Sequence, residues 1–259
     1  MNLLYEVKDY IALITINRPD VRNSLNDEAM NGIIDALTKA RKDDDVRVII
    51  IRGAGDSAFC AGADLSMLGE MQAGSIIKLR EYLKEYGKLM NALANAGKPT
   101  IAAVQGYALA GGCGLAVACD LTFASEKAHF GIPEINVGFW GMMITAPIFK
   151  AVGMKKGLEL FYTGRHIDAV EAEQIGMVNR VFPHADLFPE VMKFAAGLAK
   201  KSPVAIKMGR EAFYESRDME YDKALSYLSE MVTILASSDD CAEGVAAFKE
   251  KRKPVWQGK

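Results

Sequence analysis

The chain has 259 residues, which is enough for one large domain or for a core with a small appendage. Hydrophobic residues make up 50% and charged residues 25%, as is ordinary for a soluble globular protein. The formal net charge is −2 and no run of Lys or Arg is long enough to form a basic arm, so the composition gives no reason to expect nucleic-acid binding.

The start of the chain lacks the features of a targeting signal. Glu6 and Asp9 stand where a signal peptide would need an apolar stretch, and no apolar run approaches the ~18 residues of a membrane span. The sequence therefore predicts a cytoplasmic protein that does not bind membranes. The cysteines form no CxxC pair and stand in small or apolar surroundings, which predicts that all of them are reduced core residues: Cys60, Cys113, Cys119 and Cys241.

Strand and helix signals alternate over the first fifty residues. Residues 4–7 and 11–16 are β-rich runs, and residues 46–51 form a short apolar run that predicts a buried strand. Between them, apolar residues recur at helical spacing over 30–37, behind a candidate N-cap at Asn26.

The next stretch repeats this alternation on a larger scale. Apolar residues at helical spacing predict a long amphipathic helix over 79–93, which Gly97 and Pro99 close. Residues 100–104 and 121–124 are predicted as buried strands with an apolar helix between them. Because strands that alternate with helices need crossover connections, the sequence predicts a layered α/β core.

Strand signals thin out after Gly141. No Pro/Ser-rich linker interrupts the chain, although the sequence pattern changes near residue 200. The sequence therefore divides into a core of residues 1–200 and a helical C-terminal region of residues 201–259, which packs on the core or on a neighbouring subunit. The helices predicted after Gly141 cover residues 151–161, 168–175, 187–200, 204–215 and 221–236.

The first segment with candidate chemistry follows a buried strand, where α/β proteins place their ligands. It is rich in small residues, which let a ligand approach the main chain and leave backbone N–H groups available as donors. A tight loop that needs glycine for its geometry explains the same residues. The segment comprises Phe59, Cys60, Ala61, Gly62, Ala63, Asp64 and Leu65.

The second segment, residues 105–114, again comes directly after a strand and opens a helix. The unpaired N–H groups and positive dipole end of a helix start suit an anion or a polarised carbonyl oxygen. The glycines of this segment do not have the spacing of a dinucleotide fingerprint, and no P-loop Lys-Ser/Thr follows them. Nucleotide binding of both kinds is therefore discounted.

The third segment holds Glu134, which stands between apolar neighbours and directly after Pro133. A carboxyl group in such surroundings is expected to have a raised pKa, which suits an acid/base at neutral pH. A surface glutamate that caps the following turn is the alternative. The three histidines are scattered without metal-site spacing, so no metal is predicted.

Taken in order, these segments resemble the crotonase (enoyl-CoA hydratase/isomerase) family, and the resemblance runs over essentially the whole chain. Each motif is weak alone, but their order and intervals together are specific. The motifs are Asn17-Arg18-Pro19, Asn23-Ser24-Leu25, residues 59–65, 98–104, Gly111-Gly112-Cys113, residues 130–134, Thr163-Gly164-Arg165, residues 176–179, Glu243-Gly244 and residues 248–254.

The resemblance implies an α/β fold with a crotonase-type ββα-spiral core and a helical C-terminal trimerisation region, assembled as a homotrimer or a dimer of trimers. It implies an acyl-CoA thioester substrate, with coenzyme A as part of the substrate and no further cofactor. The backbone N–H groups of Ala63 and Gly111 would form an oxyanion hole, and Glu134 would be the acid/base. Two preorganised donors stabilise charge that develops only in the enolate.

The resemblance also implies the substrate-binding positions. Arg22 and Lys251 would approach the coenzyme A phosphates, Lys251 from a neighbouring subunit, and Phe248 would line the acyl or pantetheine side; solvated surface positions explain the two cations equally well. Trp140 suggests a bulky apolar acyl pocket, with a plain core role as the alternative. The two loops supply the other positions: Ala61, Gly62, Asp64, Leu65, Gly112 and Gly114.

One departure from the family pattern bears on the reaction. Hydratases of this family carry two glutamates, and the first position is Gly114 in this chain, so Glu134 is the single remaining glutamate. The leading interpretation is a hydratase that acts on an α,β-unsaturated acyl-CoA. The alternatives are an isomerase, which needs one base to move a proton between two carbons, and a non-catalytic family member that binds acyl-CoA.

Overall fold

The structure, a computed structural model, describes residues 2–64 and 76–259. Within them, the larger of two sheets has six strands in the order β1-β2-β3-β5-β7-β10. Its first two strands form an antiparallel hairpin, and each later pair of neighbours is parallel. These strands are β1 (Leu3–Lys8), β2 (Ile11–Ile16), β3 (Val48–Gly53), β5 (Thr100–Val104), β7 (Leu121–Ser125) and β10 (Arg180–Phe182).

A smaller sheet of four strands, again within the described ranges, has the order β4-β6-β8-β9. Its first three strands are parallel and its last pair is antiparallel. The parallel pairing places the carboxyl ends of β4 and β6 next to each other, and both candidate loops begin there. The strands are β4 (Ala58–Cys60), β6 (Tyr107–Leu109), β8 (His129–Gly131) and β9 (His166–Asp168).

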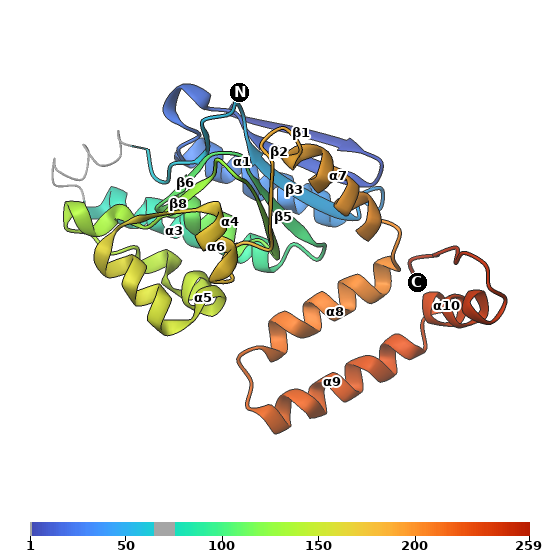
Figure 1. Cartoon of the computed structure of the whole chain (residues 1–259). Coiled ribbons are helices and arrows are strands. Elements are labelled where there is room, and N and C mark those ends of the chain that lie inside the picture. Colours follow the sequence, from blue (N-terminus) through green and yellow to red (C-terminus); the bar gives the residue numbers. More distant parts are fainter. Residues whose placement is uncertain (1, 65–75) are drawn as a thin grey trace.

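Helices surround the two sheets (Figure 1), and helices connect β2 to β3, β4 to β5, β6 to β7, β8 to β9 and β9 to β10. A short 3-10 turn precedes the first helix, and a second one follows β8. The turns are η1 (Pro19–Val21) and η2 (Pro133–Val137); the helices of the core are α1 (Asp27–Lys42), α3 (Ile76–Ala94), α4 (Gly111–Ala118), α5 (Met142–Thr163), α6 (Ala169–Gln174) and α7 (Leu187–Leu198).

The central strands of the larger sheet, β2, β3 and β5, are buried on both faces. Ile49 and Ile51 of β3 belong to one core cluster, which includes buried residues of α1, α3 and α4. Ile50, between them, belongs to a second cluster that includes Val191 of α7. Since successive side chains of a strand point to opposite faces, the continuous apolar runs in the sequence are explained by helices on both sides of the sheet.

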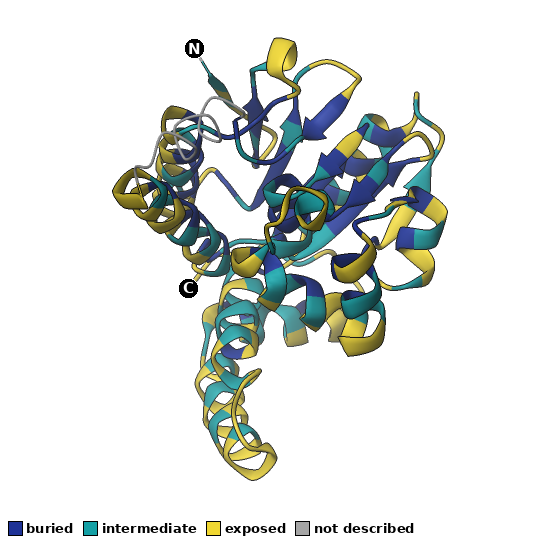
Figure 2. Cartoon of the chain, turned by 90° about the vertical axis from the view of Figure 1, so that its left-hand side faces the viewer, coloured by how far each residue is buried: buried dark blue, intermediate teal, exposed yellow. Residues whose placement is uncertain are grey.

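The C-terminal helices form an arm that projects from the core (Figures 1 and 2). Helices α8 (Pro203–Ser216) and α9 (Tyr221–Ala236) lie against each other, and α10 (Asp239–Lys249) follows. Arg210 fixes the arm to the core, because its Nε lies 2.8 Å from Asp120 Oδ2. Figure 2 shows the contrast between the buried core and the mostly exposed arm.

The predicted strands at residues 4–7, 11–16, 46–51, 100–104 and 121–124 are confirmed as β1, β2, β3, β5 and β7. The prediction that strand signals thin out after Gly141 is confirmed, because helices predominate beyond it and its two strands, β9 and β10, are short. Each has three residues, which is too short for a periodic signal. None of the helices that the structure describes is long and apolar enough to cross a membrane.

Two expectations need correction. The helix predicted over 151–161 begins earlier, at Met142, with Pro147 inside it, and α10 was not predicted. All four cysteines are free; Cys60, Cys113 and Cys119 are buried, but Cys241 is partly exposed and is therefore not a core residue.

Candidate active site

Two loops that lie far apart in the sequence meet at the edge of the small sheet where β4 and β6 end. Residues 61–64 follow β4, and residues 110–112 follow β6 and open α4. A Cβ at Gly62 would lie 2.8 Å from Ala110 Cβ and 3.2 Å from Gly111 N. Gly62 also has a φ of +92°, a left-handed conformation that favours glycine. The Gly62–Ala63 peptide therefore lies directly beside the Ala110–Gly111 peptide.

Gly112 shows how closely these loops pack. A Cβ at this position would lie 2.1 Å from the carbonyl oxygen of Cys60, so no side chain fits there. Glycine is thus required by geometry, as expected for a tight loop. The close approach also brings the backbone N–H groups of the two loops together, as expected for a site where a ligand approaches the main chain.

The amide of Ala63 is held in place by Leu25. Leu25 and Ala63 form a parallel β-bridge, in which Leu25 N donates to Gly62 O at 2.8 Å and Asp64 N donates to Leu25 O at 3.1 Å. In such a bridge the N–H and C=O of the central residue point away from the partner strand. Ala63 N–H makes no hydrogen bond to any residue that the structure describes, and is available as a donor.

The amide of Gly111 is the first of α4, where helical N–H groups have no intrahelical acceptor. Among residues 2–64 and 76–259 it also finds no acceptor. The preceding residue, Ala110, has φ 51° and ψ −128°, an unusual conformation for a residue with a side chain. Backbone strain of this kind costs of order 1–3 kcal/mol and persists only where the surroundings hold it.

Glu134 lies in the first turn of η2, directly after Pro133. Its Oε2 is buried and has no hydrogen-bond partner among the described residues. Burial raises the pKa of this carboxyl group above its ordinary value, and a hydrogen bond from its own backbone amide lowers it less. The pKa shift predicted from the apolar neighbours is therefore confirmed, and a surface cap is not the role of this side chain.

The space around Gly114 is occupied by other residues. A Cβ at Gly114 would lie 2.1 Å from Ile144 Cγ2 and 2.9 Å from the Tyr86 hydroxyl. Gly114 is buried in α4, so it is covered by α5 and α3. The position where the family pattern has a second glutamate is thus filled with an apolar side chain and a phenol.

Asp64 and Arg22 contribute to the first loop in ways that the sequence did not reveal. The Asp64 carboxylate is buried and lies 2.8 Å from Arg18 Nη2, and Ser24 Oγ donates to it at 3.4 Å. Arg22 has an exposed side chain, and its carbonyl accepts from Ala61 N at 3.0 Å. Arg18 anchors the loop through Asp64, which the motif containing it did not indicate.

The remaining predicted positions lie apart from the loops or outside the described residues. Trp140 stacks on Phe161, with 4.9 Å between ring centroids, and its Nε1 donates to Thr145 Oγ1 at 3.3 Å. Phe248, which is 86% exposed, and Lys251 stand at the end of α10. Figure 1 shows α10, the last helix of the arm, away from β6 and β8. Leu65 lies outside the described residues.

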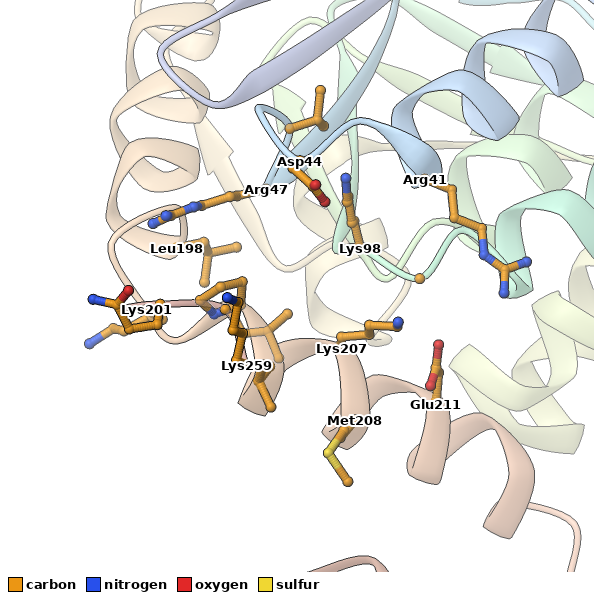
Figure 3. Close-up of a pocket in the computed structure, with 17 residues that line it drawn as sticks. Arg41, Asp44, Arg47, Lys98, Leu198, Lys201, Lys207, Met208, Glu211 and Lys259 are labelled. Atoms are coloured by element: carbon orange, nitrogen blue, oxygen red, sulfur yellow. The ribbon is translucent and has the colours of Figure 1, made fainter. Parts of the chain in front are cut away.

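A basic cavity of about 600 Å³ lies at the opposite ends of the strands. Arg47 directly precedes β3 and Lys98 lies two residues before β5, so this cavity is remote from the loops that follow β4 and β6. Figure 3 shows Arg47 and Lys201 pointing to one side of it and Arg41 and Lys207 to the other. Its cations thus do not converge on one place, and none of the predicted site residues lines it.

Known proteins of one family resemble this chain in sequence and in fold. A family model described as enoyl-CoA hydratase/isomerase matches residues 6–259. The chain is 38% identical to a probable enoyl-CoA hydratase of Mycobacterium bovis over 255 residues, which are 98% of this chain and 97% of the relative. It is 37% identical to a crotonyl-CoA hydratase of Syntrophomonas wolfei over 253 residues, which are 97% and 96% of the two chains.

The solved structures agree with the sequence comparisons. The enoyl-CoA hydratase from Bacillus anthracis superposes with a TM-score of 0.95 at 30% sequence identity and covers 100% of both chains. The fold is therefore of the crotonase type, with a helical C-terminal region, as predicted. The chain belongs to the enoyl-CoA hydratase/isomerase family.

Proposed function

We propose that the protein is an enoyl-CoA hydratase that acts on an α,β-unsaturated acyl-CoA thioester through a stabilised enolate. The thioester carbonyl would accept hydrogen bonds from Ala63 N–H and Gly111 N–H, both of which lack an acceptor among the described residues. Charge that develops on the carbonyl oxygen would then be met by donors that need no reorganisation. Coenzyme A is part of the substrate, and the reaction requires no further cofactor.

The buried Oε2 of Glu134, which has no hydrogen-bond partner among the described residues, carries this proposal. A buried carboxyl oxygen without a partner costs free energy, so its retention requires a function. As a carboxylate, Glu134 would take a proton from water while the oxygen of that water bonds to the β-carbon, and the electrons of the double bond would move into the thioester enolate. Glu134 would then return the proton to the α-carbon.

Isomerisation of a double bond is the second candidate, and the surroundings of Gly114 favour it. Ile144 and Tyr86 occupy the space beside Gly114, so that position does not supply a second carboxyl group. Moving a proton from the α-carbon to the γ-carbon of a 3-enoyl thioester needs one base and the two amide donors. Hydration needs, in addition, an oriented water molecule. A non-catalytic protein that only binds acyl-CoA would need neither the two amide donors nor the base.

The coenzyme A contacts and the assembly are proposed from the exposed parts of the chain. Arg22 would meet the phosphates. Phe248 and Lys251, at the end of α10, would reach the site of a neighbouring subunit, since α10 lies away from β6 and β8 of its own chain (Figure 1). A trimer or a dimer of trimers built on residues 201–259 is supported by α9, which buries none of its residues within the chain. Its exposed apolar side chains are Tyr221, Leu225, Leu228, Val232 and Ile234.

Two substrates distinguish the candidate reactions. The protein is incubated with crotonyl-CoA and, separately, with a 3-enoyl-CoA, while the absorbance of the conjugated thioester is followed. A hydratase lowers the absorbance of crotonyl-CoA because the conjugation is lost. An isomerase raises that of the 3-enoyl-CoA because conjugation forms. Absence of change with both substrates would contradict the proposal and leave the non-catalytic alternative.

A further inference from the structure

Two tyrosines of α3 reach the two loops of the candidate site. Tyr82 and Tyr86 are four residues apart, so both side chains lie on the same face of the helix. They are almost completely buried, with 5% and 3% of their surface exposed. Burial raises the pKa of both phenols, which keeps their hydroxyl groups protonated and able to donate at neutral pH.

Tyr86 contacts the second loop. Its hydroxyl donates to Gly111 O at 2.7 Å, and its ring lies 3.2 Å from the position that a Cβ of Gly111 would take. On the other side, Ala110 N donates to Gly131 O at 2.9 Å. The Ala110–Gly111 peptide, which carries the Gly111 N–H, is therefore held from both ends. These contacts oppose relaxation of the strained backbone at Ala110.

Tyr82 contacts the segment that holds the first loop. Its hydroxyl donates to Leu25 O at 3.2 Å, the same carbonyl that accepts from Asp64 N at 3.1 Å. Leu25 is the bridge partner of Ala63. A shift of the Leu25 backbone would thus move the Ala63 amide with it.

We propose that Tyr82 and Tyr86 are positioning residues that together fix the spacing and direction of the Ala63 and Gly111 amides. This inference rests on the proposed function, because the two amides have to act on one carbonyl oxygen. Both hydroxyls come from one rigid helix, so α3 connects two loops that belong to separate parts of the sequence. The phenols act through the backbone and do not take part in the proton transfer.

Tyr214 provides a matched control. It is a partly buried tyrosine of α8 whose hydroxyl donates to Asp120 Oδ1 at 2.8 Å. Tyr214→Phe therefore removes a hydrogen bond of similar length away from the two loops. Tyr82→Phe and Tyr86→Phe keep the rings and remove the same atom. Thermal melts of all three variants identify those that are folded.

The test uses a chromophoric cinnamoyl-CoA thioester, whose absorption moves to longer wavelength when donors polarise its carbonyl. At saturation, the unmodified protein and Tyr214→Phe should give the same shift, and Tyr82→Phe and Tyr86→Phe a smaller one. Because poorly placed donors stabilise the enolate less, kcat with the active substrate should fall about tenfold in both variants, and KM should change less than twofold.

The outcomes separate this inference from the proposed function. A full shift in both folded variants, with melting temperature alone reduced, would overturn the positioning role. If the unmodified protein shifts the absorption of the probe but turns over neither enoyl substrate, the proposed reaction fails, and the spectral comparison still decides the role of the tyrosines. No shift with the unmodified protein would refute both.

Discussion

Gly114→Ala measures how tightly the core is packed beside the candidate site. The added Cβ would lie 2.1 Å from Ile144 Cγ2 and 2.7 Å from Ile144 Cβ, so neighbouring atoms must move. Overpacking of this kind costs about 1–3 kcal/mol, whereas alanine gains about 1 kcal/mol over glycine inside a helix. Because a 2.1 Å approach is shorter than real Cβ contacts, we expect a packing cost in the upper part of this range, which leaves a net loss of about 1–2 kcal/mol in the free energy of unfolding.

A double-mutant cycle shows whether Ile144 is the cause. Ile144→Ala alone should cost about 2–5 kcal/mol, because it leaves a cavity. In that background the nearest clashing atom is gone, so adding Gly114→Ala should cost at least about 1 kcal/mol less than it does in the unmodified protein. Urea unfolding, followed by circular dichroism at one fixed protein concentration, gives all four free energies.

Gly197→Ala is the matched control, since a Cβ on this helical glycine would meet no atom of another described segment within 4 Å. It should raise the free energy of unfolding by up to about 1 kcal/mol. If Gly114→Ala stabilises the protein as Gly197→Ala does, or if the cycle is additive, Ile144 does not pack tightly against Gly114. The same packing predicts that Gly114→Glu alone cannot supply a second functional carboxylate.

Three further predictions concern charged groups. Arg18→Ala should lower the free energy of unfolding by about 3 kcal/mol in urea, because it leaves the buried carboxylate of Asp64 without its 2.8 Å ion pair; a cost below ~1 kcal/mol would contradict this. Because burial raises the pKa of Glu134, its protonated form favours the folded state, and that contribution is lost as pH rises through the folded-state pKa. Glu134→Gln should therefore gain stability relative to the unmodified protein between pH 4 and pH 8 in urea unfolding, and an unchanged difference would be inconsistent with a raised pKa. Removal of the charges of Arg22 and Lys251 together should raise KM for an acyl-CoA; an unchanged KM would reject the phosphate contacts.

Local signals in the sequence predicted much of the fold. Residues 11–16 and 100–104 are apolar runs bounded by turn residues, and both became buried strands. The Asn26 cap is also present, accepting from Ala29 N at 2.9 Å. The three-residue strands of the small sheet carry no periodicity, so they could not be predicted, although they place both loops.

The candidate site was predictable only in part, for the same reason. The apolar neighbours of Glu134 are adjacent in sequence, so the direction of its pKa shift could be inferred. Tyr82 and Tyr86 fitted an amphipathic helix pattern, which does not indicate what their hydroxyls contact 57 and 25 residues away. The covering of Gly114 by Ile144 is likewise a contact between two helices that no local pattern encodes.

Exchange of the α-protons of a saturated acyl-CoA in D₂O tests the central claim most directly. It requires the two amide donors and Glu134 but no activated water, so it applies to hydratase and isomerase alike. Followed by NMR with butyryl-CoA, the unmodified protein should exchange these protons, and Glu134→Gln should exchange them at least about 100-fold more slowly with its affinity for the thioester retained. Near-native exchange by Glu134→Gln, or no exchange by the unmodified protein, would contradict enolate chemistry driven by Glu134.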